Sequence, residues 1–215
     1  MKPMILLSDP VIAAVPVGEN GEPLVFPGGL RFGPRSPAMS PLLRDGLLRR
    51  LLAAQASLPR GLRLLVVEGY RSPALQQQYF TGYRDELREL HPEWTDERRH
   101  VEASKYVSPP EVAPHCTGGA VDLTLVTETG EELDMGTEVN ADPERSASAC
   151  FTASDKISAE ARRNRDLLGE ALTAAGLVNY PTEWWHWSYG ERYWAHTTGA
   201  TRTCYGPLPE PDSGP

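Results

Sequence analysis

Apolar residues recur every three to four positions in two long stretches of the chain, which is the spacing of one face of a helix. The first stretch is rich in leucine, begins after Ser40 and stops before Pro59, and it predicts a helix near 41–57. The second begins after Ser72 and stops at His91, where a proline follows. Its apolar face is made of leucines and tyrosines: Leu75, Tyr79, Tyr83, Leu87 and Leu90.

Two further helices are indicated by residues that favour a helix start or end. Thr95 favours a short helix after it. Ser158 favours a longer helix, which we expect to run to Gly176.

Strands are indicated where the spacing of apolar residues changes. Residues 62–67 form a short, branched, apolar run between two glycines, which predicts a buried strand. A second β-favouring run begins at 119 and ends near the turn signal at Gly130. Residues 177–189 are interpreted as two aromatic-rich strands divided at Pro181.

Helices and strands follow one another without a regular βαβ order, so the sequence predicts an α+β fold with a small, largely antiparallel sheet flanked by helices. A length of 215 residues suits one hydrophobic core, and we expect a single domain over 1–215. Proline and glycine are frequent from 16 to 41, which predicts an irregular N-terminal segment over 1–40. Residues 197–215 are expected to form a polar tail.

The formal net charge is −8, from 29 acidic and 21 basic residues. This charge disfavours nucleic acid and anionic membranes as partners and favours a small peptide or amide substrate. The first residues lack the continuous apolar core of a signal sequence, and no stretch approaches the roughly 18 apolar residues of a membrane span. We therefore expect a cytoplasmic protein, whose oligomeric state the sequence does not indicate.

Three cysteines, Cys116, Cys150 and Cys204, are odd in number and widely spaced, which fits neither a disulfide framework nor a cysteine-based zinc site. We interpret them as free thiols. Cys116 follows His115 directly, so it is either a fourth metal ligand or a small core residue, and the second role is commoner.

The first candidate for chemistry is the segment between His115 and Asp122, in which a pair of glycines can turn the chain so that the two side chains meet. Both residue types bind zinc, and catalytic zinc sites usually have three protein ligands and one open position. A third ligand is available in His186, which follows Glu183 by three residues. On a regular strand these two would face opposite sides, so we expect a bend or bulge after Pro181.

Each of these residues also has a purely structural interpretation. A histidine beside a glycine turn or in an aromatic strand is often a hydrogen-bonded structural residue, and the pattern alone leaves both interpretations open. The same holds for Arg71, which follows the strand expected at 62–67. It either acts at the strand end, where functional residues gather, or pairs with a carboxylate such as Glu68.

Four segments, taken together, resemble the zinc D-Ala-D-Ala dipeptidase family in order and spacing, from about residue 42 to 190. They are Glu68-Gly-Tyr-Arg71-Ser-Pro, His115 through Asp122-Leu-Thr-Leu, Asp134-Met-Gly-Thr137 and Glu183-Trp-Trp-His186.

The resemblance implies Zn²⁺ as cofactor, with His115, Asp122 and His186 as its ligands. It also implies that Glu183 is the general base that activates a metal-bound water, and that Arg71 stabilises the substrate carbonyl as it becomes an oxyanion. The reaction implied is hydrolysis of a small dipeptide, by default D-alanyl-D-alanine, in the chemistry of the peptidoglycan cell wall.

The chain departs from the family where the family holds the free ammonium group of its dipeptide with a Ser, an Asp and an N-terminal Tyr. Ala113 and Asn140 occupy the first two of these places, and no tyrosine precedes Tyr70. Ala113, Asn140 and Tyr70 are therefore the candidate substrate-binding residues. Another acid, such as Glu138 or Asp142, would have to replace the lost carboxylate.

These departures leave two alternatives to a D-Ala-D-Ala dipeptidase. One is a zinc enzyme of the same fold that acts on a different amide or peptide, such as an N-acylated dipeptide, in cell-wall turnover or a biosynthetic pathway. The other is a non-catalytic zinc-binding module. The presence of Glu183 and Arg71 argues against the second alternative, because a binding module needs no residue to activate water.

Overall fold

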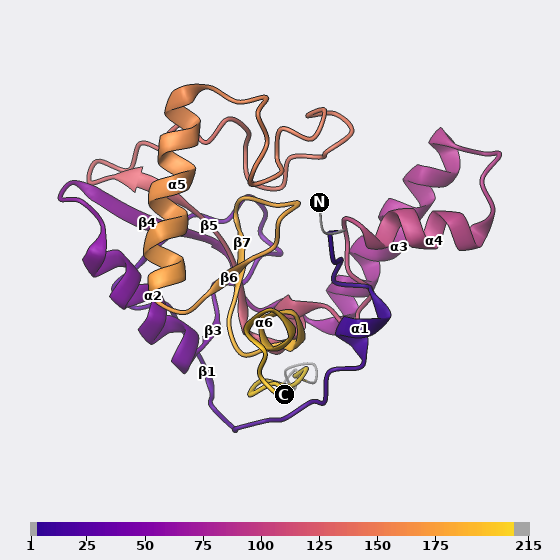
Figure 1. Ribbon diagram of the computed structural model, residues 1–215, viewed down its shortest axis with the longest axis horizontal. Helices are drawn as coiled ribbons and strands as arrows, with labels where there is room; N and C mark the ends of the chain where they lie inside the picture. The colour runs from indigo at the N-terminus through magenta and orange to yellow at the C-terminus, as the bar shows by residue number, and fades with distance from the viewer. Residues whose placement is uncertain (1–3, 209–215) are drawn as a thin grey trace.

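The computed structural model describes residues 4–208 and has a small sheet at its centre (Figure 1). The strands are β1 Leu24–Val25, β2 Arg31–Phe32, β3 Leu43–Arg44, β4 Leu62–Glu68, β5 Ala120–Thr127, β6 Val178–Asn179 and β7 His186–Ser188. The helices are α1 Pro10–Ala13, α2 Asp45–Ser57, α3 Pro73–Leu90, α4 Asp96–Ser104, α5 Ala159–Ala174 and α6 Arg192–Thr198, with a 3₁₀ turn, η1, at Pro114–Thr117.

Five of the strands form the main sheet, in the order β2-β4-β5-β7-β6. Only β2 and β4 pair in parallel, and the other neighbours are antiparallel. Strands β1 and β3 form a separate antiparallel pair. The predicted α+β fold with a largely antiparallel sheet flanked by helices is confirmed.

Helices α2 and α5 lie next to each other against one face of this sheet, where the main hydrophobic core forms (Figure 1). Strand β5 directs Val121, Leu123 and Leu125 into that core. Because successive side chains of a strand point to opposite faces, Asp122 and Thr124 lie on the other face. The apolar face of the sheet thus holds the helices, and its polar face is free to carry a site.

Helices α3 and α4 form a hairpin that extends away from the sheet (Figure 1). Its small core contains Phe80, Leu87 and Ala103. The prediction of the apolar face of α3 is partly wrong, because Leu90 is 64% exposed whereas Gln76 is buried. Leu87 faces α4 and is buried, whereas Leu90, the last residue of the helix, projects into solvent.

The start predicted for α2 is also wrong, because the helix begins at Asp45 rather than near 41. Residues 43 and 44 pair with β1 instead. The backbone N–H of Arg44 donates to the carbonyl of Gly118, and its Nε donates to the carbonyl of Thr117. These distant hydrogen bonds hold Arg44 in an extended conformation that the local sequence does not encode. The predicted caps Ser72, Thr95 and Ser158 all accept a backbone N–H at their helix starts.

Both ends of the described chain contact the body of the protein. Ile12 of α1 is fully buried beside Tyr180 and Tyr193. Within the region expected to be a polar tail, Thr203 and Tyr205 are buried. Of the helices in residues 4–208, none has the length and apolar character required to cross a bilayer.

Candidate metal centre

The polar face of the sheet gathers three acidic or histidine side chains from neighbouring strands. Asp122 of β5 pairs with Glu68 of β4 on one side and with His186 of β7 on the other. The register of β4 shifts by one residue at Val67, which forms a bulge. Without this bulge, Glu68 would share the core-facing side of Val66, so the extra residue turns Glu68 toward Asp122.

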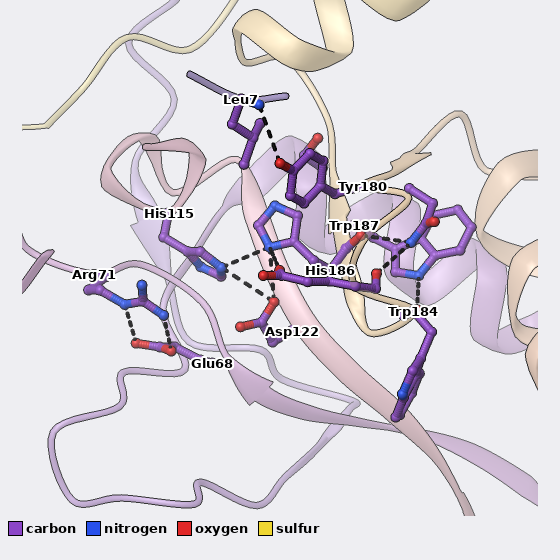
Figure 2. Close-up of polar contacts among 12 residues, drawn as sticks. Leu7, Glu68, Arg71, His115, Asp122, Tyr180, Trp184, His186 and Trp187 are labelled. Atoms are coloured by element: carbon purple, nitrogen blue, oxygen red, sulfur yellow. Dashed lines mark hydrogen bonds and ion pairs between the residues drawn. The ribbon is translucent and has the colours of Figure 1, made fainter. Parts of the chain in front are cut away.

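Three atoms that can bind a cation meet at this place (Figure 2). Nδ1 of His186 lies 3.0 Å from Oδ1 of Asp122 and 3.1 Å from Nε2 of His115. Nε2 of His115 lies 3.4 Å from the same aspartate oxygen. All three residues are buried, with 5% or less of their surface exposed. The structure thus brings together the three residues expected to bind the metal.

The orientation of His115 fixes which of its nitrogens faces the cluster. Its Nδ1 lies 2.7 Å from the carbonyl oxygen of Gly69. Because a carbonyl only accepts, Nδ1 carries the proton, and Nε2 directs a lone pair toward His186 and Asp122. Two imidazoles and one carboxylate gathered in a buried place match the donor set of a divalent metal, and a histidine held by a backbone carbonyl is typical of metal ligands.

The electrostatic environment keeps Asp122 ionised. Burial by itself raises the pKa of this carboxyl group, but the neighbouring His115 and His186 outweigh it and lower the pKa below its ordinary value. A carboxylate that stays charged is the form that binds a metal.

Glu183 lies in the turn that joins β6 to β7, where the sequence predicted a bend after Pro181. The turn is closed by hydrogen bonds from the backbone N–H of Glu183 to the carbonyl of Tyr180 and from that of His186 to the carbonyl of Glu183. Oε2 of Glu183 lies 3.8 Å from Nδ1 of His186, so the two residues face the same site. Burial is the main cause that raises the pKa of Glu183 to about 7, a value suited to proton transfer near neutrality.

Arg71 pairs with Glu68, as one of the two interpretations of the sequence expected, and it also lines the same site. Its Nε and Nη2 donate to the two carboxylate oxygens of Glu68, at 2.9 and 2.5 Å, and Nη1 donates to Oε1 of Gln76. Burial lowers the pKa of Arg71, but the hydrogen bonds and charge of Glu68 outweigh it and raise the pKa above its ordinary value. The guanidinium is therefore a permanent charge, fixed by a buried carboxylate and directed toward the site.

A cavity of about 300 Å³ opens onto these groups, lined among others by Glu68, Arg71, His115, Asp122, Glu183 and His186. Two of the candidate substrate-binding residues, Ala113 and Asn140, also line it. Tyr70 is buried and is not among the described residues that line the cavity.

Several residues of the cavity were missed by sequence reasoning: Leu7, Met39, Gln76, Tyr79, Tyr106 and Ser108. One of them carried a usable signal. Gln76 precedes Phe80 by four positions and Leu87 by eleven, so it is a polar residue on the buried stripe of α3, where an amide requires a partner. Its Nε2 donates to the carbonyl of Ser108. The others occupy ordinary positions in their segments and carry no such mark.

The cysteines have no part in the cluster. Cys116 and Cys150 are buried, Cys204 is half-buried, and none of the three is joined in a disulfide within the described residues, so all three are thiols, as expected. The group within residues 4–208 that could hold a metal ion contains His115 and its two partners but not Cys116.

A family model and two curated relatives match this chain as D-Ala-D-Ala dipeptidases. The family model described as Peptidase M15, D-Ala-D-Ala dipeptidase, matches residues 40–201. A D-alanyl-D-alanine dipeptidase of Synechocystis sp. is 30% identical over 223 residues, covering 85% of this chain and 87% of that protein. A D-alanyl-D-alanine dipeptidase of Escherichia coli is 40% identical over 72 residues, covering 34% of this chain and 35% of that protein. The solved structure of the LdcB LD-carboxypeptidase has a TM-score of 0.47 and 21% identity, covering 86% of this chain and 77% of that one.

Proposed function

The chain belongs to the M15 D-Ala-D-Ala dipeptidase family of metallopeptidases, and from this premise we propose that it hydrolyses a small dipeptide of the D-alanyl-D-alanine class in a zinc-dependent reaction. The observation that carries the proposal is the convergence of His115, Asp122 and His186 in one cavity with Glu183 and Arg71. A purely structural cluster would need neither an acid with a raised pKa nor a fixed cation beside it.

His115, Asp122 and His186 would hold the metal through Nε2, Oδ1 and Nδ1. Two imidazoles and one carboxylate form a donor set that zinc accepts readily and that leaves room for further ligands. A bound zinc ion would supply Lewis acidity at the substrate carbonyl and lower the pKa of water.

The protein's own residues would move the proton and balance the charge. Glu183 would take a proton on its carboxylate from the attacking water and deliver it to the nitrogen of the leaving amine as the C–N bond breaks. Arg71 would stabilise the negative charge that develops on the carbonyl oxygen, and its raised pKa means that it does so without titrating. Glu68 and Gln76 would keep the guanidinium in place.

The test is steady-state hydrolysis by the zinc-loaded protein of D-Ala-D-Ala and N-acetyl-D-Ala-D-Ala, with L-Ala-L-Ala as a stereochemical control. Cleavage of either D,D-compound that is lost in Glu183→Gln supports the proposal. If neither D,D-compound is cleaved, or if the Glu183 variant cleaves as well as the parent protein, the proposal is wrong.

A further inference from the structure

The cavity holds few negative charges that remain available to a substrate cation. Both oxygens of Glu68 accept from Arg71. Asp122 lies against the two imidazoles of the cluster. Glu183 faces His186 and is the proposed base. No other carboxylate is found among the described residues that line this cavity.

The acids that could take the place of a carboxylate at Asn140 do not reach the cavity. Glu138 is exposed and is not among the described residues that line the cavity. Oδ1 of Asp142 accepts the backbone N–H of Arg145, and Asp142 is likewise outside the described wall. Position 113, which also lines the cavity, is an alanine. Among the described residues, no carboxylate therefore lines the cavity in place of the one missing at position 140, although the charge of Asp142 acts on Tyr106, which does line it.

This matters because a free dipeptide carries an ammonium group on the carbon next to the bond that breaks. Such a group must lose water to enter the cavity, and a charge transferred without a partner is strongly disfavoured. An acylated nitrogen is neutral, and it brings one N–H donor and one carbonyl acceptor instead.

A second cavity, of about 350 Å³, shares a wall with the first. Tyr106 lines both cavities. Three further segments contribute one residue to each cavity. The residues of the first cavity are Leu7, Ala141 and Glu183, and those of the second are Leu6, Pro143 and Thr182. The second cavity is largely apolar, with Met4, Leu87 and Phe151 among its residues. It offers room for a group attached to the substrate nitrogen.

Tyr106 provides a neutral donor where the two cavities meet. Its hydroxyl oxygen is buried and has no hydrogen-bond partner among the described residues. Burial, reinforced by the charge of Asp142, raises the pKa of Tyr106 well above its ordinary value, so the hydroxyl keeps its proton. An uncharged O–H suits the carbonyl oxygen of an acyl group.

Building on the proposed function, we propose that the substrate is an N-acylated D-alanyl-D-alanine rather than the free dipeptide, with its acyl group extending past Tyr106 into the second cavity. The reaction remains a hydrolysis, in which water adds to the carbonyl carbon, the C–N bond breaks, and free D-alanine leaves with the proton on its nitrogen. The other product is the N-acyl-D-alanine.

The first experiment compares kcat/KM of the zinc-loaded protein for D-Ala-D-Ala, N-acetyl-D-Ala-D-Ala and acetyl-L-Ala-D-Ala-D-Ala, with products identified by mass spectrometry and Glu183→Gln as blank. We expect the acylated compounds to be preferred by about tenfold or more. A Glu183-dependent preference for the free dipeptide would overturn this inference and leave the proposed function intact. If Glu183-dependent cleavage is absent for all three, the proposed function fails as well.

The second experiment places a carboxylate in the cavity wall with Asn140→Asp. Asn140 has a φ of 64°, and aspartate adopts this conformation about as readily as asparagine, so the change adds charge with little strain. We expect kcat/KM for the free dipeptide to rise about tenfold relative to the acylated one. Glu138→Asn, in the same loop but outside the described wall, is the control, and an unchanged ratio in Asn140→Asp would contradict the inference.

The third experiment fills the second cavity from its rim with Glu144→Trp. Glu144 is exposed and lines only the second cavity. We expect KM for acetyl-L-Ala-D-Ala-D-Ala to rise about fivefold or more, as loss of one apolar subsite would give, with little change for N-acetyl-D-Ala-D-Ala. Glu138→Trp is the matched control. Equal KM values in the two variants would exclude the second cavity as the place of the acyl group.

Discussion

Two walls of the same cavity are built in different ways. One wall, which carries the candidate metal site, includes strands β4, β5 and β7, whose register sets the neighbours of Asp122. Another wall includes part of the segment 134–157, the long connection between β5 and α5, which contains neither helix nor strand (Figure 1). This segment contains all the non-glycine residues of positive φ in the described chain: Asn140, Ala147 and Ser148.

The two walls are also held by different forces. The first is fixed by backbone ladders and by the alternation of side chains across a sheet. The second is held in part by Arg165 of α5, whose Nε, Nη1 and Nη2 donate to the carbonyls of Met135, Phe151 and Ala149. A site of this kind keeps its chemistry on the rigid wall and can change its substrate through the loop wall. The comparison therefore predicts large, catalytic effects on one side and smaller effects on substrate binding on the other.

The largest effect is expected from Glu183→Gln, which removes the proposed base beside the strand wall. We expect kcat to fall by about 10²–10⁴, because glutamine cannot accept the proton. Metal content should stay the same, since the three ligands are untouched. Kinetics and metal analysis on the same samples measure both quantities. Asp122→Asn is the comparison variant and should lose metal as well as activity, so equal metal loss in both variants would argue against separate roles.

The second effect concerns the ion pair beneath the strand wall. Glu68 is fully buried, and its charge faces Arg71. Glu68→Gln leaves the guanidinium without its counter-charge, and breaking a buried pair in this way costs about 3–5 kcal/mol of unfolding free energy. Urea denaturation measures the loss.

The double variant Glu68→Gln/Arg71→Met sharpens this prediction. It removes both charges, so its stability should exceed that expected from adding the two single effects. Strict additivity would show that the two side chains are not energetically coupled. Activity should be lost in every variant that lacks Arg71.

The third effect tests the loop wall through Arg165→Met. The substitution leaves buried carbonyls of Met135 and Ala149 without a donor, which we expect to cost about 2 kcal/mol of unfolding free energy. Because the loop carries Asn140 but no metal ligand, KM should rise by a larger factor than kcat falls. Arg163→Met, an exposed change on the same helix, is the control. A pure loss of kcat at unchanged KM would show that the loop affects the chemistry directly.

The contrast between the walls also explains what the sequence could reveal. His115, Asp122 and His186 could be named together because they are residue types that bind zinc and because four segments of the chain resemble a zinc peptidase family. The structure brings them together, although their role as ligands stays a prediction. Helix starts with a local signal, such as Ser158, were predicted correctly. The start of α2 was not, because Arg44 is held by hydrogen bonds to residues more than seventy positions away.

The loop wall had no local pattern that could have revealed it. In the sequence, Arg165 is one of several arginines in a polar stretch of the predicted helix. Only the fold shows that it is buried with three carbonyls around it. Tyr106 likewise follows a polar helix and becomes part of the site only when α4 folds back on α3. Residues of this kind are placed by tertiary contacts, so sequence reasoning had no signal to use.

The smallest expected effect is on the backbone of the loop wall itself. Ala147 has a φ of 50°, in the left-handed region, where a residue with a Cβ is less stable by roughly 1–2 kcal/mol. Glycine avoids this cost but loses roughly 0.5–1 kcal/mol through the greater freedom of the unfolded chain. Ala147→Gly should therefore raise the unfolding free energy by about 0.5–1 kcal/mol, the difference between these ranges.

The matched control for this change is Ala153→Gly, at an exposed position of the same segment that is not among the residues with positive φ. Here only the cost in the unfolded chain applies, so stability should fall by about 0.5–1 kcal/mol. The two glycine variants should thus shift the urea midpoint in opposite directions. If both variants lower the urea midpoint, the loop does not hold Ala147 in the left-handed conformation. The loop wall would then be a segment that changes shape, rather than a strained segment fixed in one conformation.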